Sequence, residues 1–137
     1  MDPRRSRPLL VATCLVALAA TVLVHAIYVP RHLPGAFVRG LPYLVVGWAS
    51  YGSVFYFLGR LRPREGDRPM PNMRAADVGV ALFLCSVVLS GLLDTAGLTV
   101  GEAAAFHVPA ALGVYVGLAL AGWGFGTRTR AVNEIAA

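Results

Sequence analysis

Four long runs of apolar residues, separated by short polar segments, dominate the chain. They cover residues 9–29, 41–58, 78–97 and 100–125. With a rise of about 1.5 Å per residue, a helix over each run is about as long as the hydrocarbon core of a bilayer is thick, roughly 30 Å. No run alternates apolar and polar residues as the strand of a membrane barrel does. The pattern therefore predicts four transmembrane helices.

The first run also has features of a secretory signal peptide. Arg4, Arg5 and Arg7 precede it, and residues 17–20 offer the small side chains that a cleavage site needs. The apolar stretch continues well beyond these residues. We therefore expect the first run to be a retained membrane span.

Arginines are distributed very unevenly over the predicted loops. The N-terminal tail has three, the connection 59–76 has five and the C-terminal tail has two, whereas the opposite side has only Arg31 and Arg39. Because basic loops stay in the cytoplasm, this ten-to-two distribution places both termini there. Three prolines within 59–76 predict an irregular basic loop that contacts water and lipid headgroups.

The composition agrees with a protein dissolved in lipid. Apolar residues make up 57% of the 137 residues, charged residues only 14%, and the mean hydropathy is +0.66. A soluble domain needs about a quarter of its residues charged, so a soluble enzyme, a disordered tail and an ordinary nucleic-acid-binding domain are excluded. The net charge of +5 comes from arginine alone and lies between apolar runs. Anionic lipid headgroups are therefore the expected partner, not nucleic acid. We expect residues 1–137 to form one multi-pass domain in the plasma membrane.

Small and polar residues recur at fourfold spacing within the spans, so that each set lies on one helix face. Such faces let helices approach closely in lipid. We expect an all-α fold in which they meet in a compact up-down bundle, with self-association into a homo-oligomer as the alternative use of the same faces. The three clearest rows are Thr13, Ala17, Thr21 and His25; Ser86, Ser90 and Asp94; and Gly113, Gly117 and Ala121.

Local sequence signals predict the ends of the fourth helix. Thr99 and Glu102 have the spacing of a capping box, in which their side chains accept hydrogen bonds from free backbone N–H groups. Gly124 and Gly126 have the position of a C-terminal stop.

Three ionisable side chains lie within the predicted spans, where a charge costs about 2.5 to 3.5 kcal/mol at the helix centre. The predicted orientation places His25 and Asp94 each about 6 Å from the outer end of its span. The fourth span descends from outside and brings His107 to the same level after two turns. We therefore expect His25, Asp94 and His107 to form a polar site in the outer layer.

Several chemistries suit such a site. Imidazole and carboxylate groups bind zinc, copper or non-haem iron, and two histidines on different helices can hold a haem. A histidine and an aspartate can also relay protons or bind a cation. Structural roles compete, because His25 lies near the expected interface and Asp94 near a helix end. No HxxxH or ExxH pair narrows the choice, so the cofactor and the metal stay unidentified.

The cysteines and the known catalytic motifs add little. Cys14 and Cys85 lie within apolar runs and are expected to be packing residues. No nucleophile elbow, phosphate loop or HExxH motif occurs, so an enzyme is not expected. The first hypothesis is a non-enzymatic accessory or assembly component of a membrane complex. The alternatives are a haem- or metal-binding redox component that uses the outer histidines, and a small proton-coupled transporter or channel with Asp94 as the titrating group.

Overall fold

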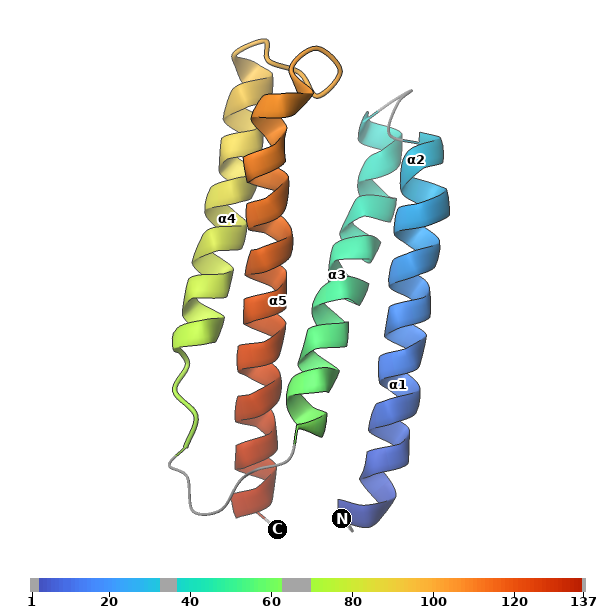
Figure 1. The fold of residues 1–137 in the computed structure, drawn as a ribbon, viewed down its shortest axis with the longest axis vertical. Helices are drawn as coiled ribbons and strands as arrows, with labels where there is room; N and C mark the ends of the chain where they lie inside the picture. Colours follow the sequence, from blue (N-terminus) through green and yellow to red (C-terminus); the bar gives the residue numbers. More distant parts are fainter. Residues whose placement is uncertain (1–2, 33–36, 63–69, 137) are drawn as a thin grey trace.

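The structure of the chain, a computed structural model, describes residues 3–32, 37–62 and 70–136 (Figure 1). Within these ranges almost every residue is helical. The π-helical segment η1 continues α1 directly, and α2 continues η1 in turn. The helical elements are α1 (Pro3–Leu23), η1 (Val24–Tyr28), α2 (Val29–His32), α3 (Phe37–Leu61), α4 (Arg74–Thr95) and α5 (Ala104–Ile135).

Four of the helical stretches in the described chain are long and apolar enough to cross a membrane. They are Arg7–His32, Arg39–Leu61, Arg74–Thr95 and Ala104–Ile135. The chain is therefore an all-helical protein with four candidate membrane spans, as the sequence predicts. The helices extend beyond most of the predicted spans, since their polar end turns continue past the apolar runs. The connection predicted at 59–76 is shorter, because α3 runs to Leu61 and α4 begins at Arg74; the part between 63 and 69 lies outside the described residues.

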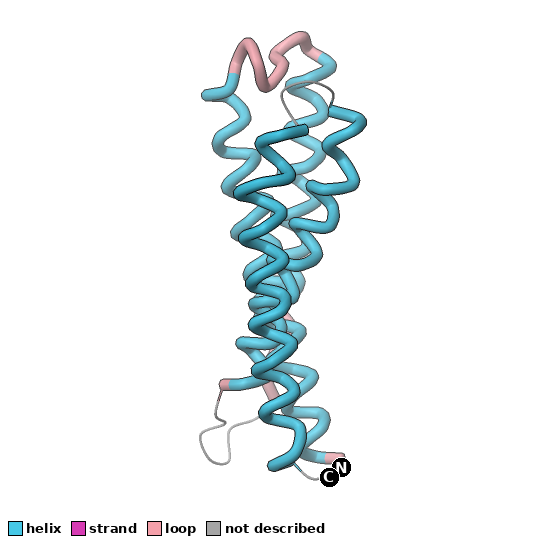
Figure 2. Tube along the Cα trace, turned by 90° about the vertical axis from the view of Figure 1, so that its right-hand side faces the viewer, coloured by secondary structure: helices cyan, strands magenta, loops and turns pink. Residues whose placement is uncertain are grey.

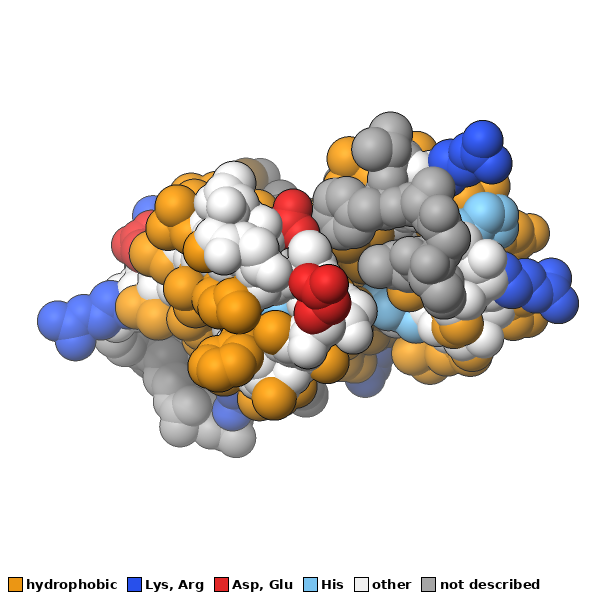
Figure 3. Space-filling view, turned by 90° about the horizontal axis from the view of Figure 1, so that it is seen from above, with side chains coloured by type: hydrophobic (Ala, Val, Ile, Leu, Met, Phe, Trp, Pro, Cys, Tyr) orange, Lys and Arg blue, Asp and Glu red, His pale blue; other side chains and the backbone are white. Residues whose placement is uncertain are grey.

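The four long helices lie in a row in the order α1, α3, α5, α4 (Figure 1). Within the part of the chain that the structure describes, no other pair of these four approaches backbone to backbone. From the side they lie largely behind one another (Figure 2), and from above the molecule is elongated (Figure 3). This open row differs from the expected compact bundle. The reason is that the small residues of α5 lie on two sides of that helix, so that α5 packs between two neighbours.

The row consists of two antiparallel hairpins, α1 with α3 and α4 with α5 (Figure 1). Their second helices, α3 and α5, run parallel and meet in the centre. Both ends of the described chain lie at one end of the molecule, which we call the arginine-rich end; the end of α2, the start of α3 and the α4–α5 connection lie at the other, the turn end. By their positions in or directly after the helices, the arginines of the described ranges at the arginine-rich end are Arg4, Arg5, Arg7, Arg60, Arg62, Arg74, Arg128 and Arg130, and those at the turn end are Arg31 and Arg39.

Glycines bring the backbones of α4 and α5 into contact. An added Cβ atom at Gly117 would lie 2.6 Å from the backbone nitrogen of Phe83 and 2.7 Å from the backbone oxygen of Gly79. One at Gly113 would overlap the Ser86 side chain, and one at Gly79 the backbone of Ala121. The predicted row of small residues on the fourth span is therefore confirmed as a packing face. We call this contact the α4–α5 seam.

The glycines near the end of α5 do not stop the helix. α5 continues past Gly124 and Gly126 to Ile135. A Cβ atom at Gly124 would lie 2.5 Å from the backbone nitrogen of Ala76, and one at Gly126 would overlap the backbone of Tyr56. The prediction of a C-terminal stop was wrong, since these glycines serve close approach to α4 and α3.

The predicted capping box at the start of α5 is also wrong. The helix begins at Ala104, and its N-cap residue Ala103 makes no side-chain hydrogen bond. Thr99 and Glu102 instead close a turn, in which the Glu102 N–H donates to the Thr99 carbonyl at 3.1 Å. The Thr99 hydroxyl donates to the Glu102 carboxylate at 3.2 Å, which leaves neither side chain on a helix N–H group.

Large apolar side chains point outward from the row. Val16 is 70% exposed and Leu112 61%, and similar side chains cover α1, α3 and α4. The buried apolar residues of the described chain are mostly small, such as Ala76, Ala110 and Val114. This distribution inverts that of a soluble domain and suits contact with acyl chains.

Candidate functional site

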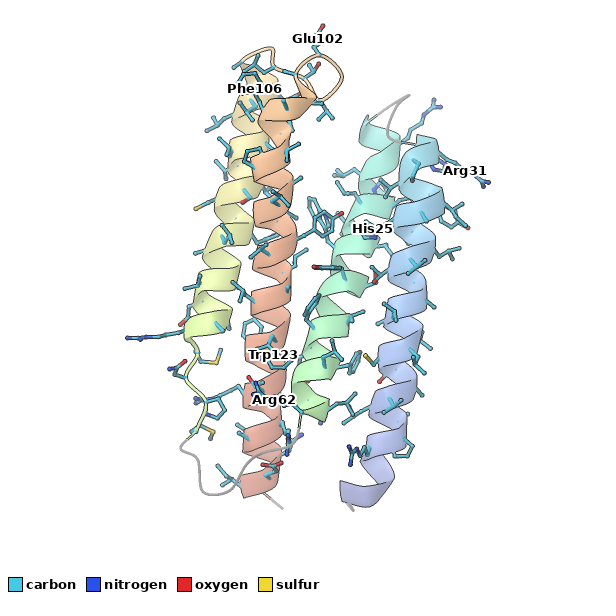
Figure 4. All side chains as sticks on the ribbon, viewed as in Figure 1. His25, Arg31, Arg62, Glu102, Phe106 and Trp123 are labelled. Carbon is cyan, nitrogen blue, oxygen red and sulfur yellow. The ribbon has the colours of Figure 1, made fainter. Side chains whose placement is uncertain are left out.

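His25 lies in η1, and its imidazole ring passes over Gly47 of α3. An added Cβ atom at Gly47 would lie 2.8 Å from Cε1 and 3.2 Å from Nε2 of His25. The missing side chain at this position therefore makes room for the ring to cross α3 toward α5 (Figure 4). The turn that carries His25 is π-helical, because the Val29 N–H donates to the Val24 carbonyl five residues earlier. Such turns often occur at functional sites.

Both ring nitrogens of His25 have partners. Nδ1 lies 2.8 Å from the carbonyl oxygen of Thr21, and Nε2 lies 2.7 Å from the hydroxyl of Tyr115 on α5. Because a carbonyl oxygen only accepts hydrogen bonds, Nδ1 carries the proton and donates it to Thr21. In the neutral ring Nε2 is then the acceptor, and the Tyr115 hydroxyl donates to it.

Tyr115 connects this contact to the other helices. The Tyr115 ring meets that of Tyr51 on α3 edge-on, with centroids 5.1 Å apart, and lies 5.5 Å from the ring of His25. Also on α3, Trp48 meets Phe83 of α4 with ring centroids 5.5 Å apart. Aromatic contacts therefore join η1 to α5, α5 to α3 and α3 to α4.

A second polar contact links α1 to α3 one turn away from His25. The Thr21 hydroxyl lies 3.1 Å from that of Ser50 and 2.8 Å from the Ala17 carbonyl, and the Ser50 hydroxyl donates to the Gly47 carbonyl at 2.9 Å. This contact and that of His25 therefore share Thr21. We call the four side chains of the two contacts the His25 network: Thr21, His25, Ser50 and Tyr115.

The direction of these hydrogen bonds limits the chemistry of the His25 network. Tyr115 donates to His25, and His25 donates to the backbone carbonyl of Thr21. A backbone carbonyl has no proton to pass on, so a proton relay along this line would stop there. The arrangement is suited to joining helices: it ties η1 to α5, which the backbones leave apart at this level (Figure 1).

His107 occupies a separate site at the turn end. It is only 7% exposed; its Nε2 lies 2.6 Å from the carbonyl oxygen of Leu98, and its Nδ1 lies 3.2 Å from the Ser90 hydroxyl. By the same reasoning Nε2 carries the proton, and Nδ1 accepts from Ser90. His107 is thus the opposite tautomer to His25 and fastens the α4–α5 connection to both of its helices.

The structure does not bring the three predicted residues into one contact. Asp94 is exposed, and Ser90, one turn earlier on α4, takes the place beside His107 that Asp94 was expected to hold. His25 bonds to Tyr115, which lies eight residues, or about 12 Å along the axis of α5, from His107. Residues 3–32, 37–62 and 70–136 also contain no group of three His, Cys, Asp or Glu side chains placed to hold a metal ion. His25 and His107 therefore belong to two different sites.

The cysteines differ from each other in their surroundings. Cys14 is buried, and its Sγ lies 3.9 Å from the Val54 carbonyl of α3, as expected of a packing residue. Cys85 is exposed on α4. Only the first of the two cysteines therefore packs between helices.

Sequence reasoning found His25 but missed its partner Tyr115. Tyr115 lies well inside its helix, where the preference of aromatic residues for the membrane interface does not account for it. That position was an available signal, since a tyrosine hydroxyl needs a hydrogen-bond partner in an apolar layer. Gly47 and Ser50 have the small side chains that favour close packing, but the sequence does not say which side chain lies against them.

Three more aromatic rings stack at the turn end. The ring centroids of His32 and Tyr43 are 4.4 Å apart and those of Tyr28 and Tyr43 5.3 Å apart, with interplanar angles of 28° and 16°. His32 Nδ1 also lies 2.8 Å from the Tyr28 carbonyl. This stack lies where the helices leave the apolar layer and is typical of a membrane-interface anchor.

We expect Gly47→Ala to displace the His25 ring. The new methyl group would overlap the imidazole, so the hydrogen bond to Tyr115 is lost at a cost of about 1 kcal/mol. Nitrogen-15 chemical shifts of labelled histidine should show that His25 Nε2 no longer accepts a hydrogen bond. Gly52→Ala on the same helix is the matched control, because its Cβ atom meets nothing closer than 3.8 Å. Unchanged His25 shifts in Gly47→Ala would contradict this geometry.

Comparisons of the chain with models of protein families, with curated proteins and with solved structures found no match.

Proposed function

We propose that this chain is a non-enzymatic, multi-pass protein of the plasma membrane that acts as an accessory or assembly component of a membrane complex. The observation that carries the proposal is the use of the two histidines within the spans. All four of their ring nitrogens are engaged by backbone carbonyls or neighbouring hydroxyls. Polar groups that form such hydrogen bonds fix neighbouring helices relative to one another. A protein that acts by binding a partner through its helix faces requires such a fixed arrangement.

The same observation weighs against the redox and transport alternatives. A haem or metal would need a free ring nitrogen, and in both histidines that nitrogen accepts from a hydroxyl group. A transporter that uses Asp94 would need that carboxylate inside the row, but Asp94 is exposed near the end of α4. The redox and transport alternatives therefore fit the structure less well than the accessory role.

We also propose that both termini lie in the cytoplasm. The arginines of the described ranges support this orientation, because eight of them lie at the arginine-rich end and two at the turn end. A tag at either terminus should be accessible to a membrane-impermeant label only after the membrane is opened. Labelling of either tag on intact cells would contradict the orientation.

Anionic lipid headgroups are the proposed partners at the arginine-rich end. Arg62 lies over the ring of Trp123, with 5.5 Å from Cζ to the centroid, and Arg60 lies over Tyr56 at 5.9 Å. A guanidinium group stacked on a ring keeps its in-plane N–H groups for an acceptor such as phosphate. The buried Nε of Arg60 has no hydrogen-bond partner. Arg128 and Arg130 are already used, by the Pro71 carbonyl and by Glu134.

The proposed complex is testable by purification. We expect extraction in a mild detergent to yield the chain with a second membrane protein, or with a second copy of itself, in a fixed ratio. The ratio should be the same after exchange into a different detergent, because a true complex does not depend on the micelle. Analytical ultracentrifugation and mass spectrometry would measure it. A chain that is monomeric and alone under every mild condition would contradict the proposal.

A further inference from the structure

One hydrogen bond ties the first helical rod to the second hairpin. The rod formed by α1, η1 and α2 packs its backbone against α3 alone among the long helices. Within the described chain, the bond between His25 and Tyr115 is the one hydrogen bond that crosses from this rod to α5. The His25 ring passes over Gly47 and takes the space that a side chain at that position would fill. The link between the two therefore depends on His25 accepting a hydrogen bond at Nε2.

We propose that His25 is a pH-sensitive latch between the first helical rod and α5, which is closed while the ring is neutral and opens when a proton binds Nε2. Imidazole is the side chain whose charge changes in the range between about pH 5 and pH 8. In the closed latch Nε2 accepts from Tyr115, so it has no proton of its own. A proton from water converts Nε2 into a second donor, and the hydrogen bond loses its acceptor.

Tyr115 does not compensate for the change. If its oxygen accepts a hydrogen bond from a charged His25, its own hydroxyl proton has to turn away from the histidine. In an apolar layer an unsatisfied hydroxyl group costs about 1 to 3 kcal/mol. Nδ1 still donates to the Thr21 carbonyl, so it does not accept the Tyr115 hydroxyl proton in place of Nε2. The charged ring is therefore more stable outside the Gly47 gap, closer to the turn end.

No described carboxylate offsets a positive charge on His25. The titratable group that contacts it from α5 is Tyr115, and α3 carries Tyr43 and Tyr51 one turn to either side of Gly47. On the side of α2 lie Tyr28, His32 and Arg31, and the positive charge of Arg31 would repel that of the ring. An uncompensated charge in an apolar layer is unfavourable, so protonation drives the ring out of its position.

Trp48 is a natural reporter of the latch, because it directly follows Gly47, over which the His25 ring lies. The chain has two tryptophans, so Trp123→Phe leaves Trp48 as the only one. In vesicles, lowering the pH from about 8 to about 5 on the side of the turn end should change the Trp48 emission along a one-proton curve. An emission that stays constant over this range would overturn the proposal.

Three variants separate His25 from other titrating groups. His25→Gln supplies a side-chain oxygen that accepts from Tyr115 and does not titrate, so the Trp48 response should be lost. His32→Gln and His107→Gln should keep it. A response that persists in His25→Gln, or that disappears in His107→Gln with helical content unchanged, would overturn the proposal.

Two further measurements do not depend on how well His25→Gln folds. Gly47→Ala forces the latch open, so its Trp48 emission at about pH 8 should match that of the parent chain at low pH. In the unsubstituted chain, nitrogen-15 shifts should show His25 with a proton on Nδ1 alone at high pH and on both nitrogens at low pH. A ring that carries its proton on Nε2 at high pH would overturn the proposal.

Discussion

Gly117→Ala is expected to separate α4 from α5 and to destabilise the protein by about 3 kcal/mol or more, since overpacking at a tight contact costs about this much. The new methyl group would meet the backbones of Phe83 and Gly79, with contacts of 2.6 and 2.7 Å. Backbone atoms have no rotamer through which to move away, so the two helices have to part. In lipid this loss is not offset by any hydrophobic attraction between helices.

The effect on the α4–α5 seam can be measured as thermal stability in a mild detergent. The fraction of chain that remains monodisperse on size-exclusion chromatography after heating should fall at a lower temperature in Gly117→Ala than in the parent. Gly91→Ala on α4 is the matched control, because no atom lies within 4 Å of its added Cβ. That variant should equal or exceed the parent, since alanine favours helix more than glycine. If Gly117→Ala were as stable as Gly91→Ala, the α4–α5 seam would not be the tight backbone contact described above.

His107→Ala is expected to loosen the α4–α5 connection, with a loss of about 3 kcal/mol. The substitution leaves the Leu98 carbonyl and the Ser90 hydroxyl without their partner at a site where the imidazole is 7% exposed. Hydrogen exchange of the backbone amides at the end of α4 and the start of α5 should become faster. The arginine-rich end should be unaffected, because His107 makes no contact there.

Asp94→Asn is the matched control for His107→Ala. The sequence placed the two residues in one site, whereas the structure leaves Asp94 exposed and His107 paired with Ser90. An exposed substitution of this kind should change the stability by less than about 0.5 kcal/mol. Comparable losses in both variants would mean that Asp94 does act on His107, and would restore the pairing that the sequence suggested.

The sequence was sufficient to predict the number of helices and one of their packing faces. The length of an apolar run and the spacing of Gly113, Gly117 and Ala121 are local properties, which a single chain displays without reference to its fold. The structure confirms both. Helix ends were harder, because Gly124 is compatible both with a C-terminal stop and with close approach to a neighbour. Only the position of Ala76 beside it decides between them.

The arrangement of the helices and the partner of His25 could not be derived from local patterns. The depth argument predicted His25 near one end of its span, and the structure places it in η1, toward the turn end, but depth alone does not say which helix lies across from it. That depends on the order of helices in the row, which puts Tyr115 behind Gly47. Asp94 and His107 likewise have similar predicted depths. On α4, however, it is Ser90 and not Asp94 that has the angular position to contact His107.

The helices of the row also differ in length, and the bilayer has to adapt to that difference. α5 has 32 residues and α3 has 25, which makes α5 about 10 Å longer. Tilting is the usual way for a long helix to fit a thinner hydrocarbon layer, but the glycines packed against Tyr56 couple the tilt of α5 to that of α3. The surplus of α5 therefore extends into the headgroup region, beyond the end of α3.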